Sequence, residues 1–212
     1  MDTARIAELL EPFLRKSDGG REELSQAQLQ ELSDYLDLLL RWNAKTNLTS
    51  VREPEAMVTR HFGESLFLAR NVSREETRSA IDLGSGAGFP GIPLKIYSPQ
   101  VAVTLIESQN KKATFLNEVI RKLTLMNINV FSGRGEESNV TADLVTLRAV
   151  EKFEEAIAMA TKLLNPGGRL ALLIAGKQIN TAKKLLAGFA IKAIPVPESR
   201  ERILVLADRN QG

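Results

Sequence analysis

The chain has 212 residues, of which 43% are hydrophobic, and a formal net charge of +2. This length predicts one domain, or one domain with an appended segment, and the small charge restricts any nucleic-acid surface to a local patch. The lack of cysteine and the single histidine exclude disulfides, thiolate chemistry and histidine-rich metal sites, so we expect no metal. Without a long apolar run or a signal-peptide pattern, we expect a cytoplasmic protein that has no membrane contact.

Residues 1–72 have helical patterns. A first short helix is limited by Pro12, and a second begins at Ser25, after which leucines recur every three or four residues. A polar connection over 43–49 follows, and Pro54 stands where it can start a third helix. We interpret these residues as an N-terminal helical extension that packs on the main domain.

From residue 73 onwards we expect the core of the protein. Short aliphatic runs alternate there with helical stretches, a pattern typical of a mostly parallel sheet with crossover helices. The expected strands are 80–83, 101–106, 128–131, 143–147, 169–174, 189–194 and 202–207. The expected helices are 91–97, 110–124, 153–164 and 178–187, with a turn over 165–168. The sequence therefore predicts an α/β, Rossmann-like core with a mostly parallel seven-stranded sheet over 73–212.

A glycine-rich motif follows the first expected strand. Asp82 ends the strand, and glycines stand at Gly84, Gly86 and Gly88, whereas the dinucleotide fingerprint G-x-G-x-x-G would need a glycine where Phe89 stands. The D-x-G-x-G-x-G spacing resembles motif I of the class I methyltransferases that use S-adenosylmethionine. Glycines let the backbone pass close to a ligand, and an acid there can receive a cationic amino group directly or through water.

Two further strand ends are candidates for nucleoside binding. Glu107 ends the second strand, where a carboxylate can accept both ribose hydroxyls. An exposed glutamate at a strand end is the alternative when Glu107 is considered alone. The turn over 132–136 follows the third strand and either borders an adenine or is a solvated loop.

The residues after the fourth strand, 143–149, stand beside the expected point of methyl delivery. They lack the Asn/Asp-Pro-Pro-Tyr/Phe box expected for methylation of exocyclic amines, and the lack of cysteine excludes covalent attack at pyrimidine C5. An acceptor that is already nucleophilic, such as guanine N7, fits these exclusions. Its in-plane lone pair needs no general base, so catalysis would be mainly positioning.

Five stretches match one known family: Leu40–Asn43, Asn47–Thr49, Arg60–Leu66, Asp82–Pro93 and Arg148–Ala149. On these stretches the chain resembles the RsmG family, also called glucose-inhibited division protein B. The resemblance implies methyl transfer from S-adenosylmethionine to N7 of a specific guanine in 16S ribosomal RNA. It also implies small-subunit ribosomal RNA, or the ribosomal subunit, as the partner of a monomeric enzyme.

The resemblance also assigns residues. It implies cofactor binding by Asp82, Gly84, Ser85, Gly86, Gly88, Phe89, Glu107, Arg134, Gly135, Glu136 and Arg148. Arg148 is the expected catalytic residue, in contact with the cofactor carboxylate or with the RNA. The candidates for RNA contact are His61, Lys177 and Arg202, with a packed histidine as the alternative for His61. Two residues depart from the family pattern, which usually has aspartate where Glu64 stands and commonly has histidine where Ile203 follows Arg202.

Two other functions remain open on sequence grounds. The same fold and cofactor serve methyltransferases that act on small molecules, because fold does not determine the acceptor. A non-catalytic RNA-binding module that uses the nucleoside pocket as a sensor is the second.

Overall fold

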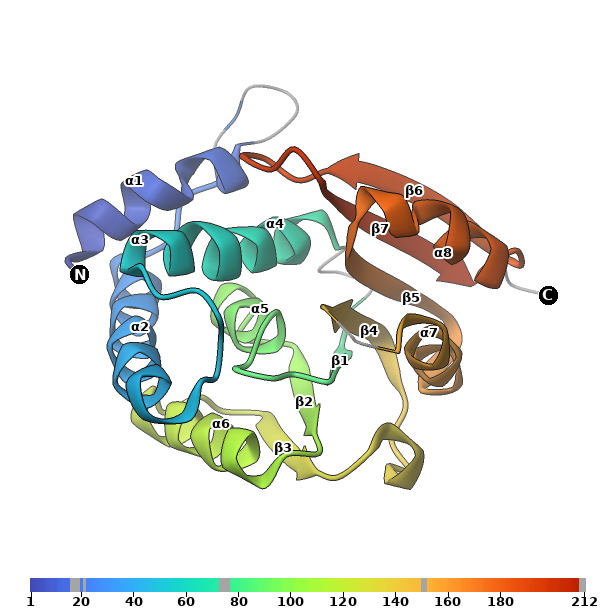
Figure 1. Cartoon of the computed structure of the whole chain (residues 1–212), viewed down its shortest axis with the longest axis horizontal. Helices are drawn as coiled ribbons and strands as arrows, with labels where there is room; N and C mark the ends of the chain where they lie inside the picture. The colour runs from blue at the N-terminus through green and yellow to red at the C-terminus, as the bar shows by residue number, and fades with distance from the viewer. Residues whose placement is uncertain (16–19, 21, 73–76, 150–151, 210–212) are drawn as a thin grey trace.

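One seven-stranded sheet forms the centre of the protein (Figure 1). The computed structural model describes residues 1–15, 20, 22–72, 77–149 and 152–209. The strands are β1 (Ser79–Leu83), β2 (Ala102–Glu107), β3 (Ile128–Ser132), β4 (Ala142–Arg148), β5 (Leu164–Ala175), β6 (Phe189–Pro195) and β7 (Arg202–Arg209). Their order is β3-β2-β1-β4-β5-β7-β6, and β7 runs in the opposite direction to the six other strands. The predicted mostly parallel α/β sheet is confirmed.

Helices cover the sheet on both faces (Figure 1). The helices are α1 (Thr3–Leu14), α2 (Gln26–Thr46), α3 (Pro54–Met57), the π-helical turn η1 (Val58–Gly63), α4 (Glu64–Asn71), α5 (Gly91–Tyr97), α6 (Asn110–Lys122), the 3₁₀ turns η2 (Gly135–Glu137) and η3 (Gly176–Gln178), α7 (Phe153–Lys162) and α8 (Ile179–Leu185). Within the described ranges, none of them has the length and apolar character that crossing a membrane requires.

Two apolar layers follow from the alternation of side chains along the strands. Ala80 and Leu105 face the layer formed with α1, α2, α4, α5 and α6. Ile81 and Ile106, the next residues along the same strands, face the layer formed with α7 and α8. Because both faces are buried, the central strands are almost continuously hydrophobic, which is the pattern the sequence shows.

Tyr35 joins the N-terminal helices to the sheet. Its fully buried ring packs edge-on against Phe62 at 5.1 Å and stacks on Phe89 at 5.3 Å between ring centroids. Its hydroxyl donates to the carbonyl of Ala87, within the loop that follows β1. Helices α1 to α4 therefore share one core with the sheet. The division of the chain at residue 72 stays a prediction, because 73–76 lie outside the described residues.

Three local features differ from the sequence expectations. Helix α2 continues to Thr46, into the predicted connection over 43–49, because the polar Asn43 side chain accepts a hydrogen bond from the Thr49 amide instead of ending the helix. Pro12 lies inside α1, where its missing N–H affects only the last turn. The predicted turn over 165–168 is part of β5, where Gly167 has a φ of 73° and the register with β4 shifts.

Gly88 provides a test of how the loop depends on α2. Its φ is +91°, and an added Cβ would lie 2.5 Å from the Tyr35 hydroxyl. We expect Gly88→Ala to lower the free energy of unfolding by about 1–3 kcal/mol, measured by urea denaturation. Gly188→Ala is the matched control, because no atom lies within 4 Å of its added Cβ. Equal stability of the two variants would contradict this packing.

Candidate active site

The loop after β1 is held against the end of β2. The amides of Gly84 and Ser85 both donate to the carbonyl of Ile106, at 2.9 and 3.0 Å. The glycines at 84, 86 and 88 all have positive φ values, of 72°, 59° and 91°. Residues with a Cβ atom rarely adopt this backbone conformation. The turn itself therefore requires glycine at these three positions.

Asp82 lies beneath the loop and does not line the cavity described below. One carboxylate oxygen accepts from the Gly91 amide at 3.0 Å, and the other accepts from the Thr146 hydroxyl at 2.8 Å. Burial raises the pKa of Asp82 to about 6, although these hydrogen bonds favour the carboxylate. Asp82 therefore fixes the start of α5 relative to β4, and its direct contact with a cofactor stays a prediction.

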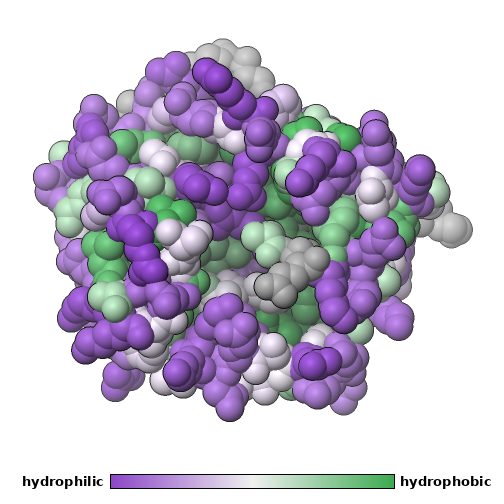
Figure 2. Space-filling model, viewed as in Figure 1, coloured by the Kyte–Doolittle hydropathy of each residue, from purple (hydrophilic) through white to green (hydrophobic). Residues whose placement is uncertain are grey.

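A cavity of about 630 Å³ opens at the C-terminal ends of β1 to β4. This volume is typical of sites for small molecules and cofactors. The residues named from the sequence that line it are His61, Gly84, Ser85, Gly86, Phe89, Glu107, Arg134, Gly135, Glu136 and Arg148. Hydrophilic residues surround the middle of this face of the molecule, and more apolar atoms are visible between them (Figure 2).

Glu107 connects the loop to the second strand end. Its Oε2 atom accepts from the Gly86 amide and its Oε1 atom from the Gln109 amide, both at 2.8 Å. Each carboxylate oxygen has a further lone pair for another donor. Glu107 is buried but lines the cavity, so the alternative of an exposed glutamate is wrong.

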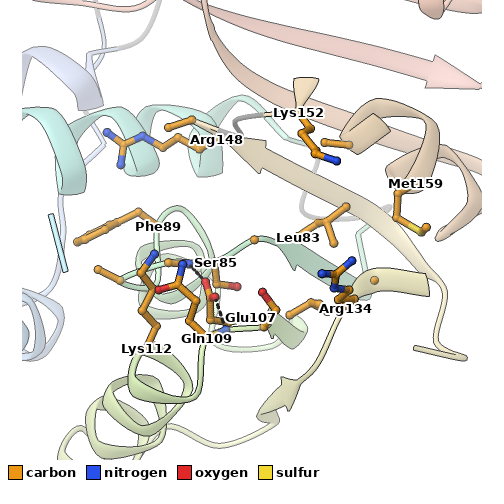
Figure 3. A pocket seen from close by; sticks show the side chains of 18 of the residues that line it. Leu83, Ser85, Phe89, Glu107, Gln109, Lys112, Arg134, Arg148, Lys152 and Met159 are labelled. Atoms are coloured by element: carbon orange, nitrogen blue, oxygen red, sulfur yellow. Dashed lines mark hydrogen bonds between the residues drawn. The ribbon is translucent and has the colours of Figure 1, made fainter. Parts of the chain in front are cut away.

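The turn after β3 lies at the same end of the cavity. Gly135 packs so closely on Leu83 and Met159 that an added Cβ would lie 2.9 Å from each of their side chains. Arg134 and Glu136 are exposed and line the mouth. In Figure 3, Arg134 and Glu107 lie across the cavity from Arg148. A role for this turn beside an adenine stays a prediction.

Arg148, at the end of β4, forms a buried ion pair. Its Nη2 atom lies 3.0 Å from Glu64 Oε2, and the two side chains are only 7% and 5% exposed. The same nitrogen donates to the Arg60 carbonyl, and Nη1 donates to His61 Nδ1 at 3.1 Å. Arg148 thus connects a sheet strand to η1 and α4. Its direct contact with cofactor or RNA stays a prediction.

His61 is held in a neutral form. Burial and the nearby positive charges of Arg148, Arg60 and Arg202 lower its pKa to about 3. Its ring stacks on Phe89 at 4.9 Å, and its Nε2 atom lies 2.8 Å from the Thr49 hydroxyl. His61 is therefore packed, which is one of the two alternatives drawn from the sequence, and it also lines the cavity. Its contact with RNA stays a prediction.

Four sequence-predicted residues do not line the cavity. Asp82 and Gly88 lie behind it, and Lys177 is exposed in η3. Arg202 pairs in register with Ala175 on β5, and its charge lowers the pKa of both His61 and Arg148, so it faces the same region from outside. RNA contact by Lys177 and Arg202 stays a prediction.

Several residues around the cavity were not singled out by sequence reasoning. Gln109 and Lys112 come from the start of α6, Lys152 and Met159 come from the segment around α7, and Thr49 comes from the loop after α2. Thr49 had a signal, because it belongs to one of the stretches that match the family. Gln109, Lys112 and Lys152 each lie within five positions of a strand end, which is the only signal they offered, whereas Met159 lies further along α7 and offered none.

The strand order and the glycine loop after β1 are those of the class I methyltransferase fold. The crystal structure of a SAM-dependent methyltransferase from Aquifex aeolicus matches the fold with a TM-score of 0.63 and 17% sequence identity, covering 78% of this chain and 98% of that one.

Sequence comparisons identify the family. The model of the GidB family, described as rRNA small subunit methyltransferase G, matches residues 28–197. The ribosomal RNA small subunit methyltransferase G of Lysinibacillus sphaericus is 34% identical over 206 residues, which cover 90% of this chain and 86% of that relative. The protein of the same name from Xanthomonas oryzae pv. oryzae is 44% identical over 151 residues, 70% of each chain. The chain belongs to the GidB family, which confirms the resemblance stated above.

The protonation of His61 can be measured directly, because it is the only histidine in the chain. We expect its imidazole NMR signals to show no titration step between about pH 5 and 8. The unfolded chain takes up this proton near pH 6.5, whereas the folded protein does so only near pH 3. The contribution of His61 to the free energy of unfolding should therefore decrease as the pH falls through this window. His61→Gln should remove that contribution and leave a smaller loss of stability at acidic pH than in the wild type. A titration step near pH 6.5 in the folded protein would contradict the buried neutral form.

Proposed function

We propose that this protein transfers a methyl group from S-adenosylmethionine to N7 of a guanine in 16S ribosomal RNA, acting as a monomer on the RNA or the small subunit. The observation that most supports this function is the order of groups along four neighbouring strand ends. The turn after β3, Glu107 after β2, the glycine loop after β1 and Arg148 at the end of β4 follow one another across the cavity.

The residues that line the cavity fit a nucleoside cofactor. The free lone pairs of Glu107 suit two ribose hydroxyls, and the apolar surface between Leu83 and Met159 suits a flat base beside the turn after β3. The loop of positive-φ glycines gives a ligand close access to the backbone. S-adenosylmethionine would supply an electrophilic methyl group when bound, and these residues would hold its nucleoside part.

The charge balance at the β4 end fits an N7 acceptor. Glu64 neutralises Arg148, and His61 is uncharged, so these three buried groups carry no net charge. The other cations near His61, Arg60 and Arg202, are not buried. Methylation at guanine N7 produces a cationic base, which a surplus of buried positive charge would disfavour. The lone pair of N7 is available at neutral pH, so no side chain has to remove a proton. The site therefore only has to position the base for methyl transfer.

Exposed cations near the cavity suit an RNA substrate. Arg134 and Lys152 line the mouth with exposed side chains, and Lys112 reaches it from α6. Lysine and arginine contacts to phosphates position a nucleic acid without reading its sequence. We propose that these residues, together with Lys177 and Arg202, hold the RNA backbone while the target base enters the cavity.

The activity is tested by incubating the purified protein with methyl-labelled S-adenosylmethionine and either 16S ribosomal RNA or the small subunit. We expect the label in N7-methylguanine, identified by nuclease digestion and mass spectrometry. Large-subunit RNA is the matched control and should remain unlabelled. Label on another base, or no label on either form of the substrate, would contradict the proposal.

Glu107 provides the test of cofactor binding. We expect Glu107→Ala to weaken the binding of S-adenosylhomocysteine by about tenfold or more in calorimetry, because two ribose hydroxyls lose a charged acceptor. Glu154→Ala is the control, because Glu154 is exposed on α7 and does not line the cavity. Circular dichroism checks that both variants fold. Unchanged affinity in Glu107→Ala would remove Glu107 from the cofactor site.

A further inference from the structure

Thr49 lines the cavity from the loop that follows α2, although nothing in the cofactor site depends on it. Its amide donates to Asn43 Oδ1 at 2.9 Å, which fixes the loop on the end of the helix. Its hydroxyl oxygen lies 2.8 Å from His61 Nε2 and accepts from the Val51 amide at 3.2 Å. The position of this hydroxyl is therefore set by three partners that belong to the protein.

The neighbours of this hydroxyl also determine whether it accepts or donates in each of its hydrogen bonds. The guanidinium of Arg148 can only donate, so His61 Nδ1 accepts from it at 3.1 Å. A neutral imidazole that accepts at Nδ1 carries its proton on Nε2, and this N–H donates to Thr49. With the Val51 amide as a second donor, both lone pairs of the Thr49 hydroxyl are occupied. The hydroxyl can offer a further partner only its own proton.

No described residue accepts that proton. A side chain that lines the cavity and has only a donor left is suited to a ligand atom that accepts a hydrogen bond. The chain of contacts from Arg148 through His61 places this donor at the β4 end, away from the turn after β3 and Glu107. Figure 3 shows Arg148 on the side of the cavity opposite Glu107. The acceptor of the methyl group belongs at this end.

We propose that Thr49 determines base specificity by donating a hydrogen bond to the O6 carbonyl of the target guanine. This inference rests on the proposed function. Guanine presents N7 and O6 as adjacent acceptors on one edge, whereas adenine presents N7 beside an amino group that donates. With both of its lone pairs occupied, the Thr49 hydroxyl cannot accept from that amino group. The N7 atom of guanine stays free for the methyl group while O6 is held.

Substitution of Thr49 tests this role. We expect Thr49→Val, which keeps the shape and removes the hydroxyl, to lower kcat/KM on 16S ribosomal RNA by about tenfold to hundredfold. S-adenosylhomocysteine affinity should stay within about twofold of the wild type, and Thr49→Ser should restore most of the turnover. Thr46→Val is the control, because the Thr46 hydroxyl donates to the Trp42 carbonyl inside α2. Thermal unfolding verifies that each variant folds.

The guanine analogue 2-aminopurine separates a contact with O6 from a general effect on the site. This base keeps N7 and lacks O6, and it is ligated into the RNA at the nucleotide that the wild-type enzyme methylates. We expect wild type and Thr49→Val to methylate this RNA at equal rates. Wild-type turnover on guanine RNA by Thr49→Val, or a parallel loss of cofactor affinity, would overturn the proposal. Failure of the proposed function itself would differ, because the wild-type enzyme would then give no N7-methylguanine.

Discussion

The buried ion pair between Glu64 and Arg148 determines how the two parts of the site meet. Removing two charges from water costs several kcal/mol per ion, and only good geometry with additional hydrogen bonds compensates for it. Here the Arg60 carbonyl and His61 Nδ1 each accept from the guanidinium, whereas its buried Nε has no hydrogen-bond partner among the described residues. Together with these hydrogen bonds, the pair joins the end of β4 to residues of η1 and α4 that are 84 to 88 positions away in the sequence. The N-terminal segment therefore supplies part of the cavity wall and is not only a cover on the sheet.

A second buried acid organises the opposite side of the site. Asp82 holds the first turn of α5 to β4 through the Gly91 amide and the Thr146 hydroxyl. Burial acts on Asp82 and His61 in opposite directions on the pKa scale, because it disfavours the charged form of both. The stability contribution of His61 is lost as the pH falls below about 6.5, whereas that of protonated Asp82 is lost as the pH rises from about 4 to about 6. The two contributions partly cancel between about pH 4 and 6.

The sheet and the loop could be predicted from sequence because their signals are local. The positions of Gly84, Gly86 and Gly88 reflect backbone angles that few other residues adopt, and the aliphatic runs reflect strands buried on both faces. Glu107 was found because a strand end is visible as the end of such a run. The partners of Arg148 were not predicted, because a pairing across 84 residues leaves no periodic pattern. Asp82 shows the same limit, since a strand-end acid looks alike whether it faces a ligand or a helix.

Fold and acceptor selection lie in different parts of this chain. The ends of the sheet strands line the cavity, and a solved methyltransferase that is 17% identical to this chain shares the fold. The residues that face the acceptor end are of another kind: His61 and Thr49 come from the N-terminal segment, and Arg148 reaches them from the sheet. Under the proposed function, a change in this segment would alter the acceptor without disturbing the strand ends that we propose hold the cofactor. The polarity of the Thr49 hydroxyl depends on the neutral His61 tautomer, which the ion pair of Arg148 holds in place. The choice of base is thus linked, through three side chains, to the contact that keeps the N-terminal helices on the sheet.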